Sequence, residues 1–236
     1  MPIDYSRTAG AGFENMSASD QTIPYLIICQ DNSAQYKKTH PDYAAKAIDG
    51  IEPGDIFNSA TQEIVCKAGT KLRVIPCFHK NSWIEWRPRS AGGGMENVYH
   101  TDDILAQTTK NEKNKDVLPN GNTIEFNINY LCLYERAEDD FIPAMVSMSG
   151  GSLKIARQWN SKMNSIVIDT GEAKFTPAMF SHTYLLSTFP DNNPEGSWMN
   201  WKVELDKIIE DETIFIQAEQ LNRGQQKQLT NSENTE

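Results

Sequence analysis

Apolar and polar residues alternate most regularly over residues 123–136, TIEFNINYLCLYER, and this period of two predicts a long strand. The even-numbered positions from Ile124 to Tyr134 then fall on one face. The apolar run from Phe141 to Met148 is expected to pair back with this strand. Upstream, residues 54–66 and 70–88 each hold two apolar runs split by a polar turn, at 58–61 and 80–82, which predicts two successive hairpins. Pro76 cannot donate a ladder hydrogen bond, so its strand should be an edge strand or a bulged one.

Helical spacing is clearest over residues 153–167, where Leu153, Ala156, Trp159, Met163 and Val167 fall on one side. A final helix is expected over 211–223, ending at Gly224, and a short one over 101–109. Two further strands are expected near 178–189 and 198–205, split by the turn PDNNPEGS.

Together these elements predict a mixed, mainly β fold: an OB-like barrel or a strongly bent antiparallel sheet elaborated with two or three helices. The chain shows no internal repeat and no interdomain linker. We therefore expect a flexible N-terminal arm over 1–16, a single OB-like domain over 17–224 and a polar disordered tail over 225–236.

Charge changes this picture because it is segregated along the chain. The net charge is −10, yet residues 64–89 carry six basic side chains and one acidic one, and residues 154–189 carry four and two. A basic band on an acidic protein can hold a polyanion while the rest of the surface repels non-specific contacts.

Motifs for an enzyme are absent from the sequence. It contains no phosphate-binding P-loop, no dinucleotide fingerprint, no nucleophile elbow and no HExxH metal motif. Cys29, Cys66, Cys77 and Cys132 are far apart and three lie in apolar segments, so they are interpreted as reduced core residues rather than metal ligands. We expect no catalysis, no cofactor and no metal.

The stretch WIEWRPRSAGGGMENVYH, residues 83–100, carries the candidate chemistry. In a strand, Trp83, Glu85, Arg87 and Arg89 share one face, while Ile84, Trp86 and Pro88 share the other, which is expected to be core. Aromatic rings that stack on bases, beside cations that neutralise phosphates, are what a single-strand binder needs. The alternative is a partly buried tryptophan beside solvated arginines. The candidate DNA-binding residues here are Arg73, Lys80, Trp83, Arg87, Arg89 and Tyr99.

Two other features extend this hypothesis. Lys154 and Arg157, with Lys162, form a basic face on the helix predicted over 153–167, although an ordinary exposed helix face is the favoured explanation unless the helix lies beside the hairpin. Gly92, Gly93 and Gly94 predict a flexible loop that could close over a bound strand. A phosphate-binding loop is less favoured, because such loops normally lead into a helix.

Three stretches resemble a family of tailed-phage proteins that bind single-stranded DNA in replication and recombination. They are GAGFENMSASDQTIPYLIICQDNSAQ at 10–35, PGDIFNSATQE at 53–63 and WIEWRPRSAGGGMENVY at 83–99. The resemblance covers most of the first 100 residues and implies an OB-like binding barrel. Phage and bacterial proteins of this kind often end in a dense acidic tail that recruits replication partners, whereas residues 225–236 are only weakly acidic. Recruitment through the tail is therefore in doubt.

The leading hypothesis is thus a non-catalytic phage protein that protects or presents single-stranded DNA. Its further expected partners are phage replication or recombination proteins and other copies of the chain, but no membrane. The polar N-terminal residues lack the apolar run of a signal peptide, which favours the host cytoplasm. Two alternatives remain open: a phage structural or interaction module whose basic band docks an acidic protein, and a nuclease or annealing accessory factor.

Overall fold

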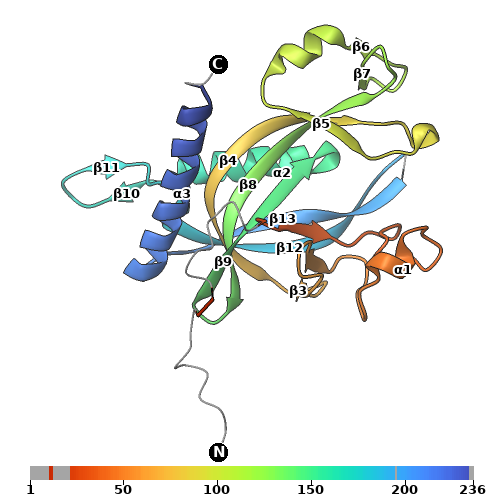
Figure 1. Cartoon of the computed structure of the whole chain (residues 1–236). Helices are drawn as coiled ribbons and strands as arrows, with labels where there is room; N and C mark the ends of the chain where they lie inside the picture. The colour runs from red at the N-terminus through yellow and green to blue at the C-terminus, as the bar shows by residue number, and fades with distance from the viewer. Residues whose placement is uncertain (1–10, 13–21, 195, 234–236) are drawn as a thin grey trace, which may run out of the picture.

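A computed structural model describes residues 11–12, 22–194 and 196–233, so the predicted arm over 1–16 lies almost entirely outside the described residues. One large curled sheet organises the molecule (Figure 1). Its strands are β1 (Tyr25–Ile28), β2 (Ile56–Asn58), β3 (Ile64–Cys66), β4 (Leu72–Trp86), β5 (Met95–Tyr99), β6 (Thr109–Lys110), β7 (Asp116–Val117), β8 (Thr123–Ala137), β9 (Asp140–Ser149), β12 (His182–Asn193) and β13 (Gly196–Ile208). The helices are α1 (Tyr43–Lys46), α2 (Leu153–Ser165), α3 (Glu212–Glu233) and the 3-10 turns η3 (Arg89–Ala91), η4 (Asp102–Gln107), η5 (Gly150–Ser152) and η6 (Met179–Ser181).

The strand order is β13-β12-β4-β8-β9-β1-β2-β3, and β5 pairs with the end of β4. Only the β1–β9 pair in this path is parallel. The curl brings β1 toward β13, where the Gln30 side chain bridges the two strands: its Nε2 donates to the Met199 carbonyl and its Oε1 accepts from the Met199 amide, both at 2.8 Å. The prediction of a mainly β, OB-like bent sheet with a few helices is confirmed.

Strand β4 corrects one expectation. It runs unbroken for 15 residues and pairs with β8 almost throughout, so the hairpin predicted at 80–82 is wrong. Lys80, Asn81 and Ser82 pair with Asn129, Ile128 and Asn127, and these partners supply the hydrogen bonds that keep the polar triplet extended. The register shifts between Pro76 and Phe78, so the predicted bulge beside Pro76 is confirmed.

Both faces of the middle of the sheet are covered. On one face, Val74 of β4 belongs to the main core, into which α2 inserts Ala156, Trp159 and Met163. On the other, Ile75 packs in a second cluster against α3. The helix predicted over 153–167 is confirmed as α2, but Val167 is 59% exposed because the helix ends at Ser165.

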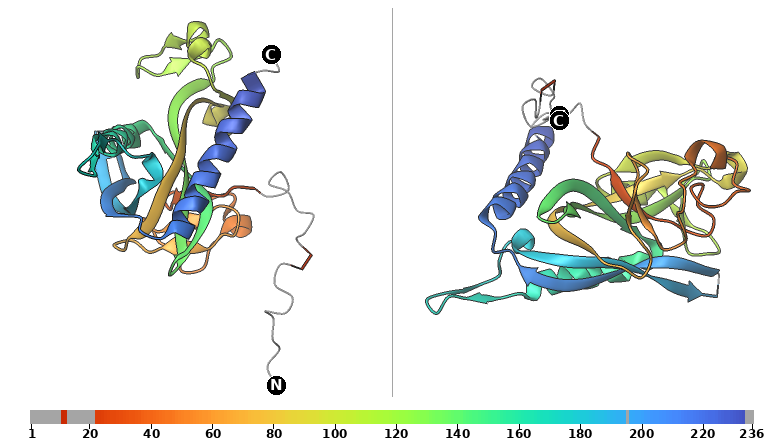
Figure 2. Two further views of the ribbon diagram at one scale, coloured as in Figure 1. Left: turned by 90° about the vertical axis from the view of Figure 1, so that its left-hand side faces the viewer. Right: turned by 90° about the horizontal axis from the view of Figure 1, so that it is seen from below.

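Helix α3 stands beside the sheet, as both views in Figure 2 show. Gln217 donates to the Phe141 carbonyl and Asn222 donates to the Cys77 carbonyl, so the helix is held at two points about one and a half turns apart. It then continues through Gly224 to Glu233, so the predicted end at Gly224 is wrong, and residues 225–233 are helical rather than a disordered tail.

A two-stranded ribbon of β10 (Ile168–Asp169) and β11 (Lys174–Phe175) projects from the body between α2 and η6 (Figures 1 and 2). No helix of the described part of the chain is long and apolar enough to span a bilayer.

Candidate nucleic-acid interface

Trp83, the predicted base-stacking residue, is engaged in the fold. Its Nε1 donates to Asp102 Oδ1 at 2.7 Å, and its ring centroid lies 4.8 Å from that of Phe126. Segment 101–122 folds over this face of β4 and supplies Ile104 and Leu118 to a small cluster that Trp83 joins. Trp83 is therefore partly buried and held in place by this hydrogen bond and this cluster, rather than standing free on the surface as we predicted.

Tyr99, the second predicted stacking residue, is held by a buried carboxylate. Its hydroxyl donates to Glu85 Oε2 at 2.6 Å, and Asn97, Asn120 and Asn122 donate to the same carboxylate. The Tyr99 hydrogen bond, followed by those from the amides, lowers the pKa of Glu85 to about 2 against the opposing effect of burial. Glu85 thus ties β5 and the turn at 118–122 to β4, which is a structural role.

The predicted arginines do not gather at one place. Arg73 and Arg87 lie at opposite ends of β4, about 45 Å apart along a strand that rises about 3.3 Å per residue. Arg73 donates to both Glu135 and Asp206 at 2.9 Å, so its charge is already neutralised. Arg87 pairs with Glu96 at 2.7 Å, and both side chains are about half exposed. Arg89 lies in η3, and its side chain is outside the described part of the structure.

The open face of β4 is the one that carries Trp86. Residues paired across an antiparallel ladder lie on the same face, so Lys80, Ser82, Ile84 and Trp86 stand beside four alternate residues of β8, from Thr123 to Asn129. Asn129 donates to Ser82 Oγ at 2.8 Å. Trp86 was expected to be core, but it is only partly buried and belongs to none of the core clusters of the described residues.

A groove of about 690 Å³ opens over this face. Its walls bring together segments far apart in sequence: β1, the β4–β5 end, β8, β9, η5 and the tip of the β12–β13 hairpin. Tyr25 and Met95 are 46% and 56% exposed on its rim. The aromatic residues that line it are Tyr25, Trp86, Trp198 and Trp201, and the other lining residues include Ile27, Ile84, Glu125, Asn129, Ser147, Ser149, Gly151 and Met199.

Trp198 is positioned by a glycine. A Cβ atom on Gly151 would lie 2.8 Å from the Trp198 ring, so only glycine allows the indole to pack over η5. Tyr25 and Trp198 were missed from the sequence, because both lie outside the basic band on which the prediction relied. In the sequence, Tyr25 is marked only as an aromatic residue at the start of a short apolar run, and Trp198 only as one that follows a polar turn.

The glycine loop beside the groove has a defined conformation. Gly92, Gly93 and Gly94 all have positive φ angles, of 93°, 64° and 99°, which explains the three glycines. The Arg87 amide donates to the Gly94 carbonyl, and the Gly93 amide donates to the Pro88 carbonyl. The loop leads directly into Met95 on the groove rim. That it closes over a ligand stays a prediction.

Unpaired cations lie on two elements near the groove. Lys80, on the groove face of β4, makes no ion pair within the described residues. Burial, and after it the nearby charge of Lys80, lowers the pKa of His100. Lys154 and Arg157 are exposed on α2, which follows η5, and they too lack ion pairs within the described part. The helix face predicted from the sequence is thus basic and solvent-accessible.

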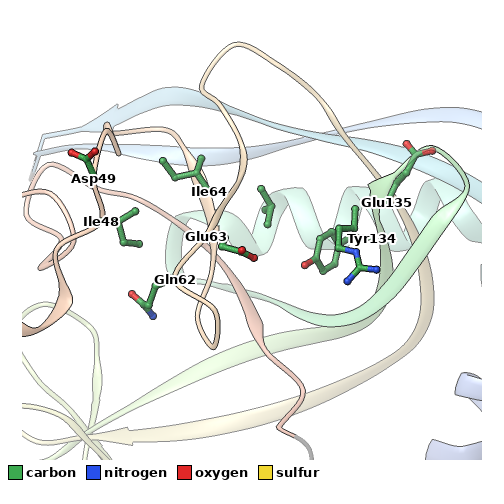
Figure 3. A pocket seen from close by; sticks show the side chains of 9 residues that line it. Ile48, Asp49, Gln62, Glu63, Ile64, Tyr134 and Glu135 are labelled. Carbon is green, nitrogen blue, oxygen red and sulfur yellow. The ribbon is translucent and has the colours of Figure 1, made fainter. Parts of the chain in front are cut away.

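A second cavity, of about 500 Å³, lies near β3 and the end of β8 (Figure 3). Its walls carry three acidic residues, Asp49, Glu63 and Glu135, and one basic residue, Arg136. This lining is net acidic, which disfavours a polyanion. The described residues contain no group of three or more potential metal ligands, and the four cysteines are buried and free.

Similarity to known families places the chain among phage proteins. A family model described as Pam3 phage gp34-like protein matches residues 1–231. The chain belongs to this family. No curated protein and no solved structure matches it. The bacteriophage origin expected from the sequence resemblance is therefore supported, while the family description states no ligand and no activity.

Proposed function

We propose that this member of the Pam3 phage gp34-like family is a non-catalytic single-stranded DNA-binding protein, and that the strand lies in the groove over β4, β8 and β9. The observation that carries the proposal is the convergence of Tyr25, Trp86 and Trp198 on one open groove from three distant segments. Bases stack on such rings with about 1–3 kcal/mol each and with little sequence preference, since every base has a π-face.

Cations at the groove's border support the same proposal. Lys80 lies on the groove face of β4, four residues before Ile84. Arg87 is paired with Glu96, but an exposed pair of this kind contributes only about 0–1 kcal/mol, so a phosphate can replace the carboxylate. The acidic remainder of the surface would repel stiff duplex DNA, which leaves a flexible single strand as the favoured ligand. A role in phage replication or recombination follows from this ligand.

Anisotropy titration of a labelled mixed-sequence oligonucleotide tests the proposal. Trp86→Ala should weaken binding by about 1–3 kcal/mol, or roughly 5- to 150-fold. Trp86→Phe should bind nearly as well as the unmutated protein, because it keeps a ring and because Trp86 Nε1 has no hydrogen-bond partner among the described residues. Trp83→Phe is the matched control: it loses the hydrogen bond to Asp102 but changes no residue of the groove.

The proposal is wrong if Trp86→Ala and Trp198→Ala both remain folded and bind the oligonucleotide as the unmutated protein does. Equal affinity for duplex and single strand would contradict it as well.

A protein-docking module is the second candidate function. Among the described residues, no lysine or arginine lines the groove, and its rim exposes Tyr25, Ile27 and Met95, as apolar docking surfaces do. The sequence predicted an acidic protein partner bound by the basic band. The apolar rim of the groove instead favours an apolar segment of a phage protein as the partner. Salt separates the two functions: single-strand affinity falls steeply as salt rises, whereas apolar docking is maintained.

A further inference from the structure

A separate cleft of about 390 Å³ lies between α2 and the β12–β13 hairpin. Trp159 and Trp201, both almost fully buried, form its floor. Its rim is polar and basic, with Gln158 and Lys162 from α2 and Lys202 from β13. Phe189 of β12, which is partly exposed, supplies a ring at the same opening.

The charges at this cleft are available to a ligand. Lys162 is exposed and makes no ion pair within the described part of the chain. Lys202 pairs with Glu204 Oε1 at 3.4 Å, while Lys71 binds Oε2 of the same carboxylate at 2.7 Å. Exposed pairs of this kind contribute only about 0–1 kcal/mol, so a phosphate can replace the carboxylate at Lys202. Helix α2 contains three basic residues and no acidic one. Two ammonium groups beside an amide and a phenyl ring match the phosphate and the base of one nucleotide.

The cleft adjoins the aromatic groove. Trp201 lines both cavities, so the two meet at this residue. Ser152 lines the groove and Ile155 lines the cleft, which places the first turn of α2 between them. Lys154 is exposed on that turn. Lys154 thus lies on the turn of α2 that separates the groove from Lys162.

We propose that the α2–β13 cleft is a second nucleotide subsite, which holds the continuation of a single strand bound in the aromatic groove. Lys162 and Lys202 contact its phosphates, and Phe189 stacks on a base. This inference rests on the proposed function, because it extends the path of the same single strand from the aromatic groove into the cleft. Short oligonucleotides fill the groove alone, and longer ones reach the cleft as well.

The test compares an oligonucleotide of about 8 nucleotides with one of about 16, both within the lengths that single OB-type domains cover. The double variant Lys162→Ala/Lys202→Ala should bind the short one normally. For the long one, the slope of log affinity against log salt should be shallower by about 1.4, since each phosphate contact contributes about 0.7. If the two proteins bind equally at 1 M salt, this difference in slope makes the affinity of the double variant for the long oligonucleotide about 25-fold lower at about 0.1 M salt.

The matched control is Lys113→Ala/Lys115→Ala, which removes the same charge from the exposed turn between β6 and β7, where neither lysine has an ion pair within the described residues. It should leave both titrations unchanged. Phe189→Leu, which keeps an apolar side chain over the floor, should weaken only the long oligonucleotide.

An unchanged slope and affinity for the long oligonucleotide in the Lys162/Lys202 variant would overturn the subsite while leaving the groove in place. Equal losses in both double variants would also overturn it, because they would reflect net charge alone. If the unmutated protein binds neither oligonucleotide at low salt, the proposed function itself fails, and the subsite fails with it.

Discussion

Replacing Glu85 by glutamine should destabilise the fold and remove a large part of its pH dependence. The carboxylate is 2% exposed and accepts four hydrogen bonds: Oε1 from Asn120 and Asn122, and Oε2 from Asn97 and Tyr99. Glutamine has one acceptor oxygen, and its NH₂ group would face two donors. Buried donors without acceptors cost about 1–3 kcal/mol each.

The pKa of Glu85 gives an independent magnitude. The Tyr99 hydrogen bond and those of the asparagines lower it from 4.5 to about 2. One unit corresponds to 1.36 kcal/mol, so the shift corresponds to about 3 kcal/mol of stability. The folded-state pKa lies below the unfolded one, so this contribution is present above about pH 4.5 and is lost as pH falls from about 4.5 to about 2.

Urea denaturation at several pH values between 7 and 2.5 measures both effects. Glu85→Gln should unfold at lower urea at pH 7, and the difference from the unmutated protein should shrink steadily below pH 4.5. Glu138→Gln, in the exposed turn between β8 and β9, is the control and should leave the curve unchanged. Parallel pH curves for the unmutated protein and Glu85→Gln would refute the reasoning.

Other predictions follow from single contacts. Tyr130→Phe should lower the free energy of unfolding by about 1–2 kcal/mol, because the buried hydroxyl donates its one hydrogen to Asn160 Oδ1 at 2.7 Å, with the Ala156 carbonyl as the other acceptor at 3.0 Å; an unchanged urea midpoint would contradict this. Gly224→Ala should stabilise the protein by about 0.5–1 kcal/mol, since Gly224 lies inside α3 with open space around it, and a loss of helical circular dichroism would show that the helix ends there after all. Gly151→Ala should displace Trp198 and cost about 1–3 kcal/mol, seen as a lower melting temperature; unaltered melting would mean that the indole moves freely.

The long strands could be predicted because their signal is local. The alternation over 123–136 gave β8, and the acidic turn at 138–140 gave its pairing with β9. The strand β4 was divided wrongly because Lys80, Asn81 and Ser82 form a polar triplet typical of a turn. Only their pairing with β8, some 50 residues away in sequence, keeps them extended.

The candidate site shows the same limit. The period-two pattern of β4 correctly placed Trp83 and Trp86 on opposite faces of the strand. It could not predict which of the two faces would stay open to solvent. Segment 101–122 covers Trp83, and that contact is not visible in any local pattern. The carboxylates that neutralise Arg73 lie on β8 and β13, so its loss as a DNA-binding candidate was likewise hidden from the sequence.

Gln30 gives the curled sheet an unusual dynamic property. Where β1 meets β13, one side-chain amide makes the two hydrogen bonds that a neighbouring strand would otherwise supply. Two such bonds are worth about 2 kcal/mol, a factor of roughly 30 between closed and open populations. Met199 lies on the groove wall, so each opening at Gln30 also widens the groove. The amide hydrogen of Met199 should therefore exchange with solvent far sooner than those in the middle of the β4–β8 ladder, and its exchange rate reports how often the contact between Gln30 and Met199 opens.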